Sequence, residues 1–124
     1  MMMYTDSSRG LNFAKDPAVV KFQDRYYMYY TMSPGKERPG TVWGIGIAQS
    51  RDLENWEKTG EIDPAGELEA LGICAPGALV YGGKVHLFYQ TYGRFEKDAI
   101  CHAWSEDGIH FVRNKTNPIL RAEG

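Results

Sequence analysis

Residues 17–30, PAVVKFQDRYYMYY, decide the fold of this chain because their pattern returns at residues 76–89 as PGALVYGGKVHLFY. Each copy reads as an apolar strand, a two-residue turn and a second strand rich in aromatic and β-branched residues. The turns, Gln23-Asp24 and Gly82-Gly83, hold residue types that tolerate positive φ, as tight β-hairpins require. The sequence therefore predicts two copies of one hairpin, 59 residues apart.

The repeat continues beyond the hairpins with a shorter offset of 55 residues. AQSRDLENW at residues 48–56 aligns with AWSEDGIHF at residues 103–111, and both follow the pattern Ala-x-Ser-x-Asp-x-x-x-aromatic. Serine and aspartate cap turns through their side chains, so this segment predicts a turn between a third and a fourth strand. The expected strands cover about residues 16–22, 25–32, 42–49, 56–61, 76–81, 84–91, 98–104 and 109–114.

Four antiparallel strands that repeat every 55 to 59 residues are typical of propeller blades. We therefore predict an all-β fold of two four-stranded antiparallel β-propeller blades, taken from a five-bladed propeller. The expected parts are an N-terminal segment at 1–15, blade 1 at 16–73 and blade 2 at 74–124, with one helical turn near 67–71. An immunoglobulin-like sandwich is the structural alternative, but it needs about seven strands and a Cys and Trp spacing that this chain lacks.

The composition narrows the class of partner. With 43% hydrophobic residues and a formal net charge of -2, the chain can bury a core and has no run of like charge for nucleic acid or a membrane surface. We therefore expect a neutral, polar partner. Cys74 and Cys101 are too few for a disulfide scaffold and read as buried thiols, although a disulfide between them stays open. The first six residues lack the features of a secretory signal, and the compartment is undecided.

Several motifs resemble a known group of enzymes. KDPAVV at residues 15–20, followed by YYMYYT at 26–31, resembles the opening blade of five-bladed glycoside hydrolases of families 43, 32 and 117. IAQSRDLENW at 47–56 is similar to their A-x-S-x-D-L-x-x-W segment, and residues 75–89 are similar to their second blade. The resemblance covers nearly the whole chain. It implies hydrolysis of glycosidic bonds in oligosaccharides or polysaccharides.

The same resemblance implies a role for Asp16. In these families the aspartate of the first blade's Asp-Pro pair is a catalytic carboxylate, which acts as a general base or a nucleophile depending on the family. The second blade often has an aspartate directly after Ala-Pro, and this chain departs from that pattern with Gly77. The general acid of these enzymes usually lies in the third blade or beyond. A five-bladed propeller would take roughly 280 residues, so we expect a truncated or partial chain whose exposed blade flanks allow self-association.

A carboxylate suits this place because glycosidic hydrolysis usually needs two carboxyl groups around the scissile bond. Pro17 has no N–H, which suits the first position of a strand and favours an extended conformation for Asp16. The loops after the second strands and before the third strands are expected at the same end of the blades as Asp16. The residues there expected to contact substrate are Trp43, Gln90, Tyr92 and Arg94, and Ser33 lies in the same loops.

Other readings stay open for some of these residues. Trp43 fits packing between blades as well as it fits sugar stacking, and Glu67 and Glu69 read as solvated loop charges. The histidines at 86, 102 and 110 form no local metal motif, and no cofactor is expected, although a central ion remains possible. Gly44-Ile45-Gly46 lacks the pattern of a phosphate loop and predicts small residues beneath an aromatic ring. The rival function is a non-catalytic carbohydrate-binding or protein-interaction propeller.

Overall fold

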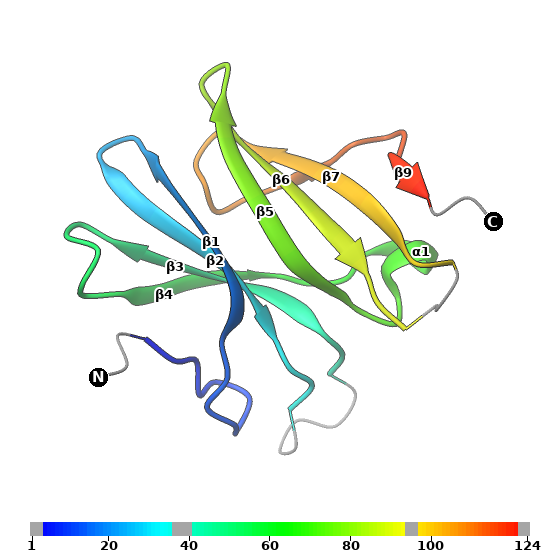
Figure 1. The fold of residues 1–124 in the computed structure, drawn as a ribbon, viewed down its shortest axis with the longest axis horizontal. Helices are drawn as coiled ribbons and strands as arrows, with labels where there is room; N and C mark the ends of the chain where they lie inside the picture. The colour runs from blue at the N-terminus through cyan, green and yellow to red at the C-terminus, as the bar shows by residue number, and fades with distance from the viewer. Residues whose placement is uncertain (1–3, 36–40, 94–96, 122–124) are drawn as a thin grey trace.

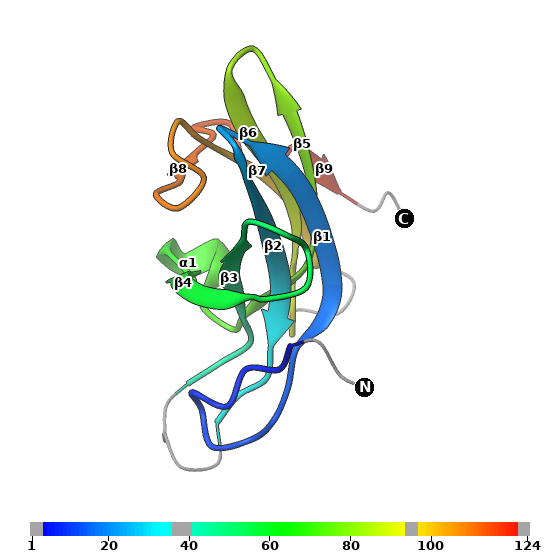
Figure 2. The ribbon, with the colours of Figure 1, turned by 90° about the vertical axis from the view of Figure 1, so that its left-hand side faces the viewer.

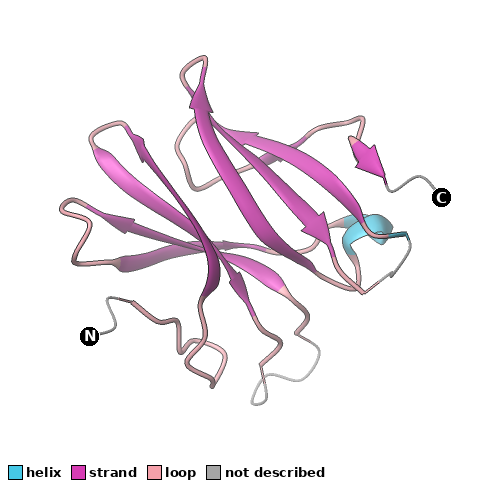
Figure 3. Ribbon diagram, in the orientation of Figure 1, coloured by secondary structure: helices cyan, strands magenta, loops and turns pink. Residues whose placement is uncertain are grey.

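The computed structural model describes residues 4–35, 41–93 and 97–121, and these fold into two twisted antiparallel sheets joined by one short helix (Figures 1 and 3). The first sheet has the order β1-β2-β3-β4 and the second the order β5-β6-β7-β8, with β9 paired to β7. The strands are β1 (Lys15–Phe22), β2 (Arg25–Met32), β3 (Gly44–Ser50), β4 (Glu57–Ile62), β5 (Ile73–Tyr81), β6 (Lys84–Thr91), β7 (Ala99–Ser105), β8 (Val112–Arg113) and β9 (Leu120–Arg121). Helix α1 (Gly66–Glu69) connects β4 to β5. The predicted all-β architecture of two blades is confirmed.

The turns have the predicted chemistry. Gln23 and Asp24 have φ of 51° and 65°, and Gly82 and Gly83 have φ of 61° and 75°, so both hairpins close through left-handed residues. The serine-aspartate turns also form in both blades. Ser50 Oγ accepts the N–H groups of residues 52 and 53, and Ser105 Oγ accepts those of residues 107 and 108. These local rules explain why two segments of different composition adopt one backbone.

The core lies between the two sheets because side chains alternate strictly along the strands. In β6 and β7 every odd-numbered residue is buried and every even-numbered residue is half-buried. The buried residues of the shared core come from both blades: Phe22, Tyr27, Tyr29, Ile45, Ile47, Ile62, Ile73, Val85, Leu87, Tyr89, Cys101 and Ala103. The prediction of a small residue under an aromatic ring is confirmed at Gly46, where an added Cβ would overlap the ring of Tyr30.

The N-terminal segment covers the other face of blade 1 (Figures 1 and 2). The ring of Tyr4 packs edge-on against Tyr30 at 5.4 Å, and the Tyr30 hydroxyl donates to Asp6 Oδ2 at 2.8 Å. Lys58 Nζ of β4 lies 2.7 Å from the same carboxylate oxygen. This segment therefore buries Tyr30 completely. The corresponding outer face of blade 2 leaves Leu79 and Leu120 exposed.

The fourth strand of blade 2 is shorter than predicted. A strand was expected at 109–114, but only β8, at 112–113, pairs with β7. The Asp107 carboxylate accepts the N–H groups of residues 109 and 110, which holds that stretch in the turn. Beyond β8 the Asn117 side chain bonds both the N–H and the carbonyl of His102, so a side chain takes the place of a strand partner. The chain then returns to β7 as β9, which was not expected.

Two further expectations concern the chain as a whole. Cys74 and Cys101 are both buried free thiols, so the disulfide left open above is absent. Within the described ranges no helix is long and apolar enough to cross a membrane.

Candidate active site

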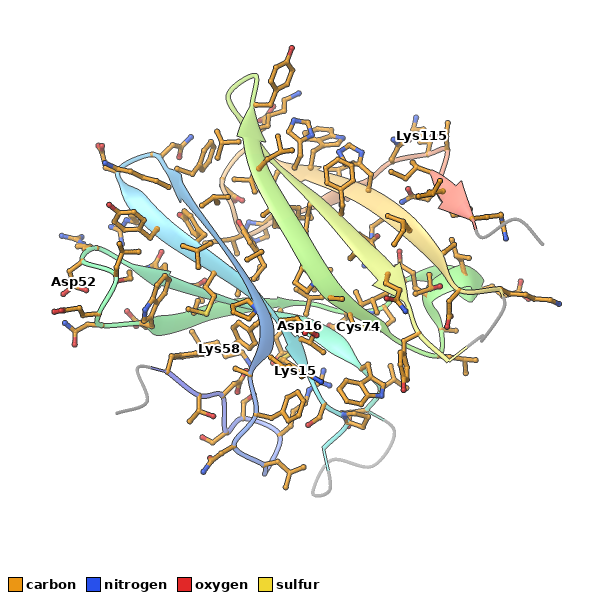
Figure 4. The ribbon with its side chains drawn as sticks, in the orientation of Figure 1. Lys15, Asp16, Asp52, Lys58, Cys74 and Lys115 are labelled. Carbon is orange, nitrogen blue, oxygen red and sulfur yellow. The ribbon has the colours of Figure 1, made fainter. Side chains whose placement is uncertain are left out.

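Asp16 lies at the entrance of β1 with its side chain exposed, at the place where β1 passes β5 in the middle of the molecule (Figure 4). Thr31 Oγ1, at the end of β2, donates a hydrogen bond to Asp16 Oδ2 at 3.0 Å. The expected extended conformation of Asp16 is wrong, because its φ is 55°. The β1–β2 register shifts between Lys15 and Ala18, and this bulge turns the aspartate into the left-handed region despite Pro17. Aspartate is among the residues that accept this conformation most readily.

Blade 2 repeats the same device with a different residue. The β5–β6 register shifts between Cys74 and Gly77, and Ala75 inside this bulge has φ of 52°. Its N–H donates to Thr31 Oγ1 at 2.8 Å, so the entrance of blade 2 contacts the residue that holds Asp16. The place of the usual family aspartate, Gly77, is exposed, and the nearest atom to an added Cβ there would be 3.9 Å away.

Cys74 is a buried neighbour of this entrance (Figure 4). Burial raises the pKa of its thiol to about 11, and the charges of Asp16 and Asp98 raise it further. Cys74 therefore stays protonated near neutral pH and adds no charge to the entrance. Asp98, which precedes β7 and accepts a hydrogen bond from Thr91 at 3.2 Å, is a second carboxylate at this end of the sheets. Its place before a third strand could have been read from the shorter repeat offset.

Three of the four residues expected to contact substrate lie at the same end, but they do not form one cluster. Trp43 and Tyr92 lie together, with ring centroids 5.4 Å apart, and Trp43 also packs edge-on against Phe13. The Trp43 carbonyl accepts the N–H of Ile73 at 3.0 Å, so the tryptophan also stitches the two blades. Gln90 is half-buried on the face of β6 that turns away from blade 1. Arg94 lies outside the described residues.

The acidic linker residues differ from the expectation in one case. Glu67 is exposed, as expected of a solvated charge. Glu69 is only 3% exposed and accepts hydrogen bonds from Tyr89 at 2.7 Å and from Arg113 at 3.0 Å. The interpretation of Glu69 as a solvated loop charge is therefore wrong, because α1 folds it into the base of blade 2. Ser33 is also buried, and its carbonyl accepts Arg9.

Thr31 is the functional candidate that reasoning from the sequence missed. Its signal was available, because counting back from the Gln23–Asp24 turn along an unbroken antiparallel register puts Asp16 opposite Thr31. The bulge moves the backbone pairing by one residue, so that Lys15 pairs with Thr31. The two side chains nevertheless meet.

The histidines take structural places. His86 Nδ1 and His102 Nε2 lie 3.0 Å apart with their rings nearly parallel, and burial, followed by the charge of His86, lowers the pKa of His102. His110 bonds the Asp107 carboxylate within the second serine-aspartate turn. Among the described residues, no group of three or more His, Cys, Asp or Glu side chains is arranged to hold a metal ion.

Comparison with solved structures identifies the class. The fold matches fructan 1-exohydrolase IIa from Cichorium intybus with a TM-score of 0.75 and 22% identity, over 89% of this chain and 22% of that one. It matches a family 117 glycoside hydrolase from Zobellia galactanivorans (TM-score 0.76, 19% identity, 97% of this chain and 37% of that one). A family 32 β-fructofuranosidase from Bombyx mori gives 0.71 and 21% identity, over 89% and 24%. The chain thus has the blade architecture of the propeller glycoside hydrolases, and it spans 22% to 37% of the length of these three proteins.

The family model for the N-terminal domain of glycosyl hydrolases family 32 matches residues 10–124. The chain therefore belongs to this family. This assignment confirms the resemblance drawn from the KDPAVV and A-x-S-x-D-L-x-x-W segments, which lie within the matched residues.

Proposed function

We propose that this chain forms the first two blades of a glycoside hydrolase in which Asp16 is the catalytic general base or nucleophile. The observation that carries the proposal is the exposed Asp16 carboxylate at the entrance of the strand that adjoins the next blade, held by a hydrogen bond from Thr31. A group in that place faces the end of the blades where a sugar can meet residues of several blades. The second carboxyl group that glycosidic hydrolysis needs would come from another blade.

The substrate class follows from kinship. Solved structures of similar proteins hold 1-kestose in the fructan exohydrolase and sucrose in a Bombyx mori β-fructofuranosidase variant. We propose fructose-containing oligosaccharides as the substrates to assay first. The paired rings of Trp43 and Tyr92 offer an apolar surface beside the entrance, and such surfaces suit the less polar face of a sugar ring.

The test is Asp16→Asn in the full-length protein that carries these blades, with hydrolysis of sucrose and 1-kestose as the readout. We expect kcat/KM to fall by roughly 10³-fold or more, since a carboxamide neither accepts the proton nor attacks the anomeric carbon. Asp24→Asn, at the far end of β1, is the matched control and should keep full activity.

Near-normal turnover by Asp16→Asn would remove Asp16 from the mechanism. If the wild-type protein binds these sugars in calorimetry and hydrolyses none of them, the rival reading as a non-catalytic carbohydrate-binding module is correct. Thermal unfolding of every variant shows whether a loss of activity is a loss of fold.

A further inference from the structure

We infer that Thr31 is a positioning residue for the Asp16 carboxylate and that the Ala75 amide of the neighbouring blade sets the direction in which Thr31 donates. This inference rests on the proposed function of Asp16 and adds a device that spans two blades. It is carried by two consecutive hydrogen bonds, from Ala75 N–H to Thr31 Oγ1 at 2.8 Å and from Thr31 Oγ1 to Asp16 Oδ2 at 3.0 Å.

The direction of this chain is fixed by the chemistry of its ends. A backbone N–H is an obligatory donor, so Thr31 Oγ1 must accept from Ala75. A hydroxyl has a single proton, and the remaining partner of this hydroxyl is an acceptor, the Asp16 carboxylate. The Thr31 proton therefore points at Asp16. An ionised carboxylate accepts such a bond more strongly than a neutral oxygen does.

The surroundings keep the hydroxyl in this arrangement. Thr31 is 2% exposed, so water does not compete freely for its hydroxyl. Its side chain is β-branched, which restricts rotation about χ1. The hydroxyl is thus a rigid donor aimed at a flexible, exposed carboxylate. Within the described part of the chain it binds Oδ2, which leaves Oδ1 as the oxygen that can react.

Ala75 supplies the second, independent observation. Alanine at φ of 52° is strained by roughly 1–2 kcal/mol, and no side-chain hydrogen bond of its own can compensate, unlike aspartate in the same conformation. This strained geometry aims its N–H across the blade junction at Thr31. The bulge of blade 2 therefore serves the carboxylate of blade 1, and the junction of the blades becomes part of the candidate site.

The experiment compares Thr31→Val with Thr31→Ser in the full-length protein, with kcat and KM measured separately on 1-kestose. Valine keeps the shape and removes the hydroxyl, whereas serine restores it. We expect Thr31→Val to lower kcat by about 10- to 100-fold while KM changes less than about threefold, because misplacing a reacting group costs rate more than binding. Thr31→Ser should recover at least half of the lost kcat.

Tyr29→Phe is the matched control. Tyr29 lies two residues away on the same face of β2, is fully buried, and donates to the Gly108 carbonyl of blade 2 at 2.7 Å. Its loss removes an inter-blade hydrogen bond of the same strand without touching Asp16, so stability should fall and kcat should not.

The outcomes separate the two proposals. If Thr31→Val keeps the wild-type kcat while Asp16→Asn abolishes activity, the positioning role is wrong and the proposed function stands. If serine fails to rescue, or Tyr29→Phe lowers kcat as much as valine does, Thr31 acts only through stability and the inference is overturned. If Asp16→Asn itself keeps full activity, the proposed function fails, and the inference falls with it.

Discussion

The two blades contain the same ionic arrangement, built from different residues and different segments. In blade 1, Asp6 of the N-terminal segment accepts the Tyr30 hydroxyl and lies 2.7 Å from Lys58 of β4. In blade 2, Glu69 of α1 accepts the Tyr89 hydroxyl and lies 3.0 Å from Arg113 of β8. The tyrosines are equivalent by the longer repeat offset and the cations by the shorter one.

This parallel shows that each blade is closed by whatever precedes its first strand. For blade 2 the preceding segment is the linker from blade 1, and for blade 1 it is the N-terminal segment. Both carboxylate side chains are only 4% exposed, so each pairs with its cation in a largely desolvated place. Burial and the nearby carboxylate raise the pKa of both Tyr30 and Tyr89, so these hydroxyls remain donors.

The entrances of the blades show the opposite relation, since one backbone carries two chemistries. Asp16 and Ala75 occupy equivalent bulges with nearly equal φ. Only the first has a functional group, and the second contributes its amide to the first through Thr31. A propeller can therefore keep its blades alike in backbone and still concentrate its chemistry at single positions.

The largest expected effect tests the ionic parallel in blade 2. Glu69→Ala leaves Arg113 and the Tyr89 hydroxyl without their carboxylate, and removing one partner of a buried ion pair costs about 3 kcal/mol or more in unfolding free energy. Asp6→Ala should cost less, about 2 kcal/mol, because Lys58 keeps Glu61 at 2.6 Å. Urea unfolding of the purified chain measures both.

The control for that comparison is Glu67→Ala, on the same short helix but exposed, which should change the unfolding free energy by less than about 0.5 kcal/mol. An equal loss for Glu67 and Glu69 would mean that the helix, and not the buried carboxylate, closes blade 2. A larger loss for Asp6 than for Glu69 would reverse the expected order of the two arrangements.

The next effect is a pH dependence confined to blade 1. Burial alone would raise the pKa of Asp6, but hydrogen bonds from Lys58, Ser8 and Tyr30 outweigh it and lower the pKa to about 2. Because the folded pKa lies below the ordinary value, the stabilisation is complete above about pH 4 and is lost as the pH falls toward 2. The expected loss is about 2 kcal/mol.

Asp6→Asn isolates this contribution. The difference in unfolding free energy between wild type and Asp6→Asn should shrink steadily from pH 5 to pH 2, since the other carboxyl groups titrate in both proteins. A difference that stays constant over this range would show that the Asp6 charge does not stabilise the N-terminal segment. Urea titrations at intervals of half a pH unit resolve the two cases.

The sequence predicted what depends on local rules and missed what depends on distant partners. The hairpin turns and the serine-aspartate turns follow from residue types within a few positions, and strand alternation then placed the core. Asp6 and Glu69 lie outside the aligned repeats, and each meets a tyrosine 20 or more residues away, so no short pattern reported them. The left-handed Asp16 was missed because a bulge in the paired register overrode the preference that Pro17 imposes.

The smallest effect tests whether equivalent turns are equivalent in energy. Ser50 and Ser105 each accept two backbone N–H groups, so replacing either by alanine should cost about 1 kcal/mol. Ser105→Ala should cost somewhat more, about 1.5 kcal/mol, because its turn also presents the Gly108 carbonyl to Tyr29 of blade 1 at 2.7 Å.

Measuring both variants in the Tyr29→Phe background decides the origin of that excess. If the excess cost of Ser105→Ala comes from the blade junction, it should disappear when the Tyr29 hydroxyl is absent, and the two serines should then cost the same. An excess that survives in that background would place its origin inside the turn of blade 2. In that case the repeat would conserve the shape of the turn between blades without conserving its contribution to stability.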